Sequence, residues 1–120
     1  MKVFEKDGHL NFVDDANCFV GMETTQCCCE DFGWWVSTDI DGPDRSKIES
    51  DLEGFSFDKE FFRYDRHGGD GGHAASFRLH GKDETKYLHI YNDHNGYYCH
   101  GFKFCETRFS GDAVLWQGDL

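Results

Sequence analysis

The sequence lacks any apolar run that approaches the roughly 20 residues of a membrane-spanning helix. Its first eight residues, from Met1 to Gly8, also lack the apolar core of a secretory signal. These two absences predict a soluble, cytoplasmic protein that has no membrane partner.

Basic residues are scarce. The chain has 12 Lys and Arg against 23 Asp and Glu, which gives a formal net charge of -11. Nucleic acids and anionic membranes are bound through clustered Lys and Arg, so the charge argues against both as direct partners. A basic protein partner, or simple solubility, explains the acidity better.

Proline and branched aliphatic residues are also few. There is one Pro, and the 14 Ile, Leu and Val are outnumbered by 20 Phe, Tyr and Trp. Aromatic side chains favour pleated, half-buried surfaces, and the 14 Gly supply turns. We predict a single domain over residues 1–120, mainly β, as a β-sandwich or β-roll of antiparallel hairpins with one short helix. An α+β fold is the alternative.

Turn signals and apolar alternation place the elements along the chain. Asp7-Gly8 predicts a type I′ turn in a first hairpin over residues 3–12. Ser46 and Glu49 match a capping box for a short helix that ends near Gly54, after a loop over residues 38–45. The remaining expected strands cover residues 18–22, 33–37, 55–64, 75–80, 86–92, 97–105 and 113–117.

A second hairpin is predicted at Asn95-Gly96, with residue 91 opposite 100, 89 opposite 102 and 87 opposite 104. Alternation then puts His89 and His100 on one face, and it turns Cys99 away from His100. The face that we expect to form the core wall comprises Tyr87, His89, Tyr91, Tyr98, His100, Phe102 and Phe104. Leu88 and Ile90 are placed on the opposite face.

The six Cys do not show the spacing of a disulfide framework, because three of them are consecutive at positions 27–29. Zinc accepts thiolate, imidazole and carboxylate ligands, so Cys28, Cys29 and Glu30 could bind it together with the hairpin histidines. Adjacent Cys in an extended chain point apart, however, and small buried thiols are the simpler interpretation. A Cys nucleophile activated by His is a third possibility, although no particular pair is indicated.

Three other features have an ordinary structural interpretation. The Gly-rich segment 68–72 lacks the Lys-Ser or Lys-Thr of a phosphate-binding loop, and residues 39–42 predict a turn rather than a calcium loop. Trp34 and Trp35 point to opposite faces if they lie on a strand. Core packing of both is preferred over an exposed protein-binding anchor.

The segment from Gln26 to Glu30, read together with Asn95 to Tyr98, resembles the signature of an uncharacterised family of small bacterial and phage proteins. That family pairs a Gln-x-Cys-Cys-Glu motif with a C-terminal strand that reads Asn-Gly-Tyr-Tyr. Many relatives carry His-Asp where this chain has Thr24 and Thr25, so a metal site that uses that His is not implied here. The resemblance implies a phage or prophage accessory protein and transfers no activity.

These observations favour a noncatalytic accessory protein that binds a basic protein, a role that extends to inhibition of a host nucleic-acid-handling or defence complex. No cofactor is expected in this interpretation. Its candidate binding residues are Trp34, Trp35, Asn95, Tyr97 and Tyr98. The alternative is a zinc-binding domain or metal-assisted hydrolase, with candidate ligands Cys28, Cys29, Glu30, His89 and His100.

Overall fold

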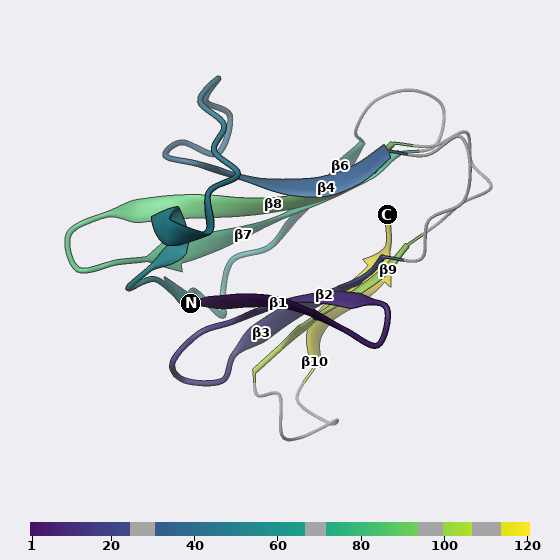
Figure 1. Cartoon of the computed structure of the whole chain (residues 1–120). Helices are drawn as coiled ribbons and strands as arrows, with labels where there is room; N and C mark the ends of the chain where they lie inside the picture. Colours follow the sequence, from purple (N-terminus) through teal and green to yellow (C-terminus); the bar gives the residue numbers. More distant parts are fainter. Residues whose placement is uncertain (25–30, 67–71, 94–99, 107–113) are drawn as a thin grey trace.

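A computed structural model of the chain describes residues 1–24, 31–66, 72–93, 100–106 and 114–120, and these residues form a two-layered antiparallel β-sandwich (Figure 1). Sheet A has the strand order β1-β2-β3-β9-β10, and sheet B has the order β4-β8-β7-β5, with β6 also paired to β7. The strands of sheet A are β1 (Lys2–Lys6), β2 (His9–Val13), β3 (Phe19–Glu23), β9 (Gly101–Cys105) and β10 (Val114–Asp119). Those of sheet B are β4 (Asp31–Ser37), β5 (Ser56–Phe57), β6 (Arg63–Arg66), β7 (His73–His80) and β8 (Thr85–Asp93). The prediction of a mainly β protein is confirmed.

The chain passes between the sheets twice. It leaves sheet A after β3 and enters sheet B at β4, and it returns from β8 to β9. The two crossings use neighbouring strands in each sheet, because β3 pairs with β9 in sheet A and β4 pairs with β8 in sheet B. Both crossings therefore connect the same end of the two sheets.

The first predicted hairpin is confirmed. Strands β1 and β2 pair directly, with Lys6 opposite His9. Asp7 and Gly8 have φ values of 53° and 74°, as a type I′ turn requires at both of its central positions.

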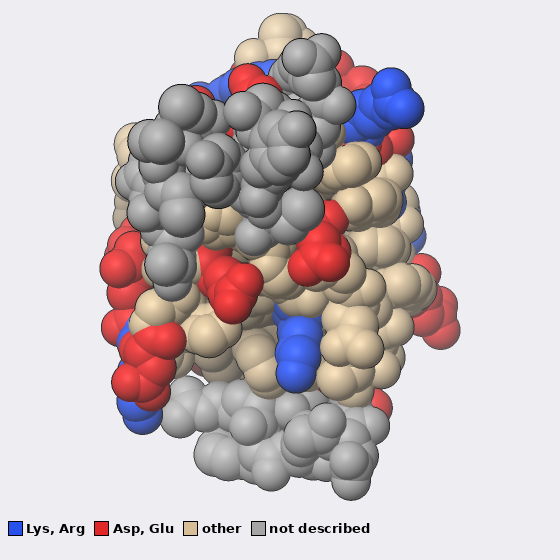
Figure 2. Space-filling model, turned by 90° about the vertical axis from the view of Figure 1, so that its right-hand side faces the viewer, with Lys and Arg blue, Asp and Glu red and all other residues tan. Residues whose placement is uncertain are grey.

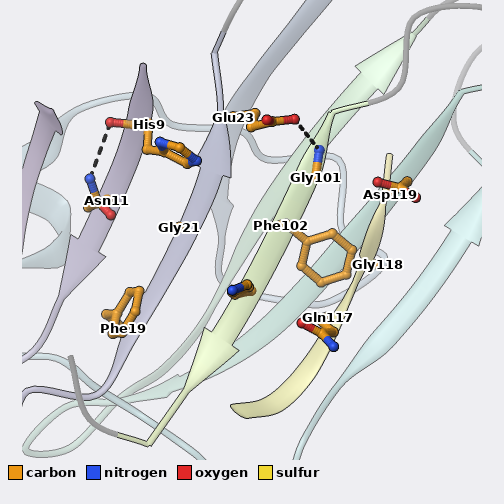
Figure 3. Close-up of a pocket in the computed structure, with 11 residues that line it drawn as sticks. His9, Asn11, Phe19, Gly21, Glu23, Gly101, Phe102, Gln117, Gly118 and Asp119 are labelled. Atoms are coloured by element: carbon orange, nitrogen blue, oxygen red, sulfur yellow. Dashed lines mark hydrogen bonds between the residues drawn. The ribbon is translucent and has the colours of Figure 1, made fainter. Parts of the chain in front are cut away.

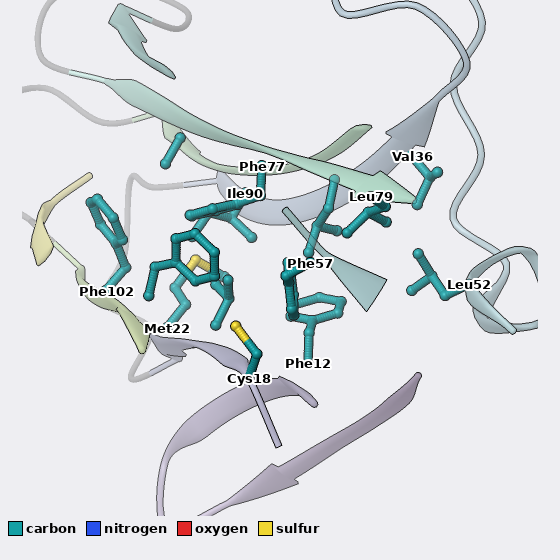
Figure 4. Packing of buried hydrophobic residues seen from close by; sticks show 14 of the residues in the cluster. Phe12, Cys18, Met22, Val36, Leu52, Phe57, Phe77, Leu79, Ile90 and Phe102 are labelled. Carbon is teal, nitrogen blue, oxygen red and sulfur yellow. The ribbon is translucent and has the colours of Figure 1, made fainter. Parts of the chain in front are cut away.

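The space between the sheets is filled by a mixture of aliphatic and aromatic side chains (Figure 4). Phe77 lies 5.0 Å from Phe104 and 6.3 Å from Phe57, measured between ring centroids, and both pairs meet edge to face. Fully buried side chains include Phe12, Val20, Met22, Leu52, Phe77, Leu79, Leu88, Ile90, Phe104 and Leu120. The scarcity of aliphatic residues is thus compensated by rings that join the two sheets.

The predicted hairpin between β8 and β9 is wrong in its pairing. These strands lie in different sheets, so residues 87, 89 and 91 are not opposite 104, 102 and 100. Leu88 and Ile90, placed on the far face by the prediction, share the main core with Phe102 and Phe104. Both faces of β8 are buried, so alternation alone could not tell which face meets the partner layer.

Two smaller predictions are also corrected. The helix is a single 3-10 turn, η1 (Glu49–Leu52), whose N-cap is Ile48, because Ser46 instead forms a backbone bridge with Val36 of β4. The expected strand over residues 55–64 is broken into β5 and β6 by a turn. Asp58 stabilises this turn, since its carboxylate accepts hydrogen bonds from the Glu60 N–H and from the Arg78 guanidinium.

One buried carboxylate joins the two layers. Asp14, in the turn between β2 and β3, is 5% exposed and accepts the N–H groups of Ala16 and Cys18 at 2.9 Å. Its second oxygen accepts the N–H of Phe57 on β5 at 3.0 Å. Three backbone donors, two of them in buried hydrogen bonds, are therefore satisfied by one side chain.

Candidate functional site

A groove of about 610 Å³ crosses the outer face of sheet A (Figure 3). Strands β2, β3, β9 and β10 supply its floor and walls. The lining residues are His9, Asn11, Phe19, Gly21, Glu23, Gly101, Phe102, Lys103, Gln117, Gly118 and Asp119. We call this feature the sheet A groove.

Two glycines help to create the hollow, because Gly21 and Gly101 leave the outer face of the sheet without side chains. Gly21 pairs with Lys103, and Gly101 pairs with Asp119. Glycine inside a strand weakens it and often marks a place where a ligand approaches the backbone. At Gly101 a Cβ would meet its nearest neighbours at ordinary contact distances of 3.5 Å and more, so packing does not require glycine there.

Two carboxylates flank Gly101. A Cβ at this position would lie 3.5 Å from Glu23 Oε2 and 3.7 Å from Asp119 Oδ1, so one small group there could contact both oxygens. The Gly101 N–H donates to Glu23 Oε2 at 3.1 Å and fixes that carboxylate over the strand (Figure 3). His9 is opposite Glu23 across β2 and β3, so this acidic end of the groove spans four strands.

The other end of the groove has aromatic, amide and basic side chains. Phe19 is half-buried, and Asn11, Lys103 and Gln117 lie in one row across the sheet. A second hollow of about 470 Å³ adjoins it over β1 and shares His9, Asn11 and Phe19. The outer face of sheet A is therefore hollowed across its full width, a shape that suits an extended ligand.

The outer face of sheet B is built differently. Trp35 of β4 and His89 of β8 are opposite each other, and their rings stack at 4.5 Å. The Arg45 guanidinium covers the Trp35 ring at 4.3 Å from its centroid. These contacts leave Trp35 only 8% exposed and His89 only 2% exposed.

The hydrogen bonds of His89 identify its tautomer. Ser37 Oγ donates its proton to the Asp39 carbonyl at 2.7 Å, so it must accept from His89 Nε2–H at 2.8 Å. The Ser76 hydroxyl then donates to His89 Nδ1 at 2.7 Å. Burial, together with the positive charges of Arg63 and Arg45, lowers the pKa of His89 from 6.5 to about 4. The imidazole is therefore neutral at pH 7.

Both predicted tryptophan positions are packed. Trp34 faces the main core, where its ring lies 5.4 Å from Phe12, and Trp35 faces the opposite side. The preferred interpretation of core packing agrees with these contacts. The large exposed apolar side chains of the described residues are Ile48 and Tyr64 instead.

The predicted histidine pair is not brought together. His89 lies on the outer face of sheet B, whereas the His100 ring donates to the Glu23 carbonyl at the end of sheet A and contacts the Phe32 ring in a tilted arrangement. The expectation that they share a face is wrong, because it depended on the incorrect β8–β9 register. Within the ranges that the structure describes, no three His, Cys, Asp or Glu side chains form a metal-binding group.

Several predicted site residues lie outside the described residues, namely Cys28, Cys29, Glu30, Asn95, Tyr97 and Tyr98. Two other thiols are described. Cys18 is fully buried, and burial raises its pKa to about 12, while burial also raises the pKa of Cys105. Neither provides a reactive thiolate at pH 7.

No helix among the described residues is long and apolar enough to cross a membrane. No family model, no curated protein and no solved structure matches the chain.

Sequence reasoning missed the sheet A groove. The signal that could have found it is the presence of Gly21 and Gly101 inside segments with strand periodicity. The pairing of β3 with β9 could not be predicted from the sequence. This pairing places Glu23 and Asp119 on either side of Gly101.

Proposed function

We propose that this protein is a noncatalytic binding protein that holds a basic, extended segment of a partner protein in the sheet A groove. The observation that carries the proposal is the position of Glu23 and Asp119, whose oxygens lie on either side of the bare backbone at Gly101. An Arg or Lys side chain of the partner would enter between them. Charge-assisted hydrogen bonds to carboxylates are about twice as strong as neutral ones.

The rest of the groove suits the neighbouring residues of such a segment. Asn11 and Gln117 offer amide groups for a partner backbone, and Phe19 offers a ring face to an apolar or cationic side chain. Lys103 stands in the middle row and would repel a second basic residue there. We therefore expect recognition of one Arg or Lys in a mixed sequence, rather than of a polybasic tract.

The charge of the whole chain supports the same class of partner. A formal net charge of -11 attracts basic proteins over a distance and speeds their association at low salt. Acidic side chains are spread over the face shown in Figure 2, where basic ones are fewer. The resemblance to small bacterial and phage proteins makes an accessory role our proposal for the biological setting, including inhibition of a host nucleic-acid-handling or defence complex.

A peptide-binding experiment tests the proposal. We expect a hexapeptide with one central Arg to bind in a fluorescence anisotropy titration, and the same peptide with citrulline at that position to bind at least tenfold more weakly. The double variant Glu23→Gln, Asp119→Asn should reduce Arg-peptide affinity at least tenfold, because the amides keep the shape and remove both charges. Raising the salt concentration should weaken the wild-type complex.

The matched control is Asp83→Asn with Glu84→Gln, two exposed residues in the turn between β7 and β8. This double variant removes the same charge far from the groove and should leave the affinity unchanged. Equal loss in both double variants would mean that overall acidity, and not the groove, attracts the peptide. Absence of binding across a set of Arg and Lys peptides would contradict the proposal.

Zinc binding is a second candidate function, and the observation that favours it is the position of the strand ends around the two motifs. Glu23 and Gly101 are hydrogen-bonded, and Asp31 pairs with Asp93, so the described residues that flank 25–30 and 94–99 lie at one end of the sandwich. His100 is also at this end, whereas His89 is not. We therefore no longer propose His89 as a zinc ligand. Elemental analysis of protein purified without a His tag tests this candidate, and zinc well below one equivalent would contradict it.

A further inference from the structure

A second hollow, of about 240 Å³, lies on the outer face of sheet B. Trp35, Ala74, Ser76 and His89 form its floor, and residues 40–45 together with strand β6 form its rim. It shares no lining residue with the sheet A groove. We call this hollow the arginine pocket.

Three of the five Arg in the chain line this pocket, namely Arg45, Arg63 and Arg66. Arg63 is fixed by two carboxylates, since its Nη1 lies 2.9 Å from Asp41 and its Nε lies 2.7 Å from Asp65. Arg45 and Arg66, by contrast, form no ion pair with any residue in the described part of the chain. Three arginines and two aspartates thus line one hollow, in a chain where acids outnumber bases by 23 to 12.

The polar side chains of the floor, Ser76 and His89, do not offer a hydrogen-bond donor to a ligand, so the guanidinium groups must supply the donors. The Ser76 hydroxyl donates to His89 Nδ1, and His89 Nε2–H donates to Ser37 Oγ. His89 is neutral, so it adds no charge of its own. The donors available to a ligand are therefore those of Arg45 and Arg66, with Arg63 held beside them.

We infer that the arginine pocket binds a small oxyanion, of the size and charge of sulfate or phosphate, between Arg45 and Arg66. The guanidinium group presents planar pairs of N–H donors that match two oxygens of such an anion. A volume of about 240 Å³ is below that of pockets for drug-sized ligands, so the pocket suits a small anion better than a nucleotide. Asp41 and Asp65 hold Arg63 in place and also keep the site from attracting larger polyanions.

Titration of the tryptophan fluorescence with sodium sulfate tests this inference, with sodium chloride added to hold the ionic strength constant. Arg45 lies against Trp35, so binding should change the emission in a saturable way. Inorganic phosphate should compete with sulfate. The double variant Arg45→Gln, Arg66→Gln should weaken binding at least tenfold.

The single variant Arg66→Gln, at an exposed strand position, should weaken binding severalfold and serves if the double variant fails to fold. Lys82→Gln is the matched control, because it removes one positive charge at an exposed residue that lines neither hollow and should leave sulfate affinity unchanged. Trp35→Phe should lose the fluorescence change yet keep the binding heat in calorimetry. A linear response to sulfate, or equal weakening by Lys82→Gln and Arg66→Gln, would overturn the inference and leave the sheet A groove proposal untouched.

Discussion

The two outer faces of the sandwich differ in how they are covered. On sheet B, Trp35 and His89 are stacked, hydrogen-bonded and covered by Arg45. On sheet A, Glu23, Lys103 and Asp119 stand exposed above glycines, and a groove runs between them. On sheet B the cover buries two rings and leaves a small hollow, while sheet A carries the larger groove.

The connections between strands explain this difference. In sheet A, two residues join β1 to β2 and five join β2 to β3, so neither connection can fold over the sheet. In sheet B, the segment after β4 turns back, and Ser46 pairs with Val36 of that strand. This return brings Arg45 over Trp35 and closes the face.

The largest contrast between the faces should come from removing an aromatic ring. Trp35→Ala should lower the free energy of unfolding by about 3 to 4 kcal/mol, because it empties a buried, stacked position. Phe19→Ala in the groove should cost about 1 kcal/mol, since that ring is only half-buried. Urea unfolding measures both, and equal costs would contradict the distinction between a covered and an uncovered face.

Acid should weaken the covered face selectively. The pKa of His89 is about 4 in the folded protein and 6.5 in the unfolded chain, so the unfolded chain takes up a proton first as the pH falls. Stability from this group is complete above pH 6.5 and decreases as the pH falls toward 4, by about 3 kcal/mol in total. Unfolding of the wild type and of His89→Gln between pH 7 and pH 4 measures it. Parallel pH profiles of the two proteins would contradict this prediction.

The smallest expected effect concerns the glycines of the groove. Gly101→Ala should change stability by less than about 1 kcal/mol, because the new methyl group makes only ordinary contacts. It should nevertheless weaken Arg-peptide binding, since it occupies the space between Glu23 and Asp119. Gly21→Ala should cost more stability, because its Cβ would lie 3.2 Å from Asn11 Oδ1. Thermal unfolding and peptide titration of both variants test this order.

Local chemistry made part of the fold predictable. The Asp7-Gly8 hairpin followed from turn geometry, and most strand positions followed from aromatic alternation. The sheets to which β8 and β9 belong could not be predicted in the same way. The Asn95-Gly96 dipeptide indicates a hairpin, but it does not show whether the strands on either side join the same sheet. Leu88 and Phe104 belong to one core between the two sheets, and no local pattern distinguishes that arrangement from two faces of one sheet.

The candidate sites were less predictable than the fold. The acidic end of the groove joins residues 23, 101 and 119, and the arginine pocket joins residues 45, 63 and 66. Such groups depend on strand order, which is a property of the whole chain. The two tryptophans were correctly expected to point to opposite faces, because that inference required only the alternation of one strand.

The strand order also determines when each layer can form. Sheet B uses one continuous stretch, residues 31–93, whereas sheet A combines residues 2–23 with residues 101–119. A chain emerging from the ribosome could complete sheet B first, and one edge of β3 would stay unpaired until β9 has been synthesised. The sheet A groove would then be among the last features to appear during synthesis, because it needs β9 and β10.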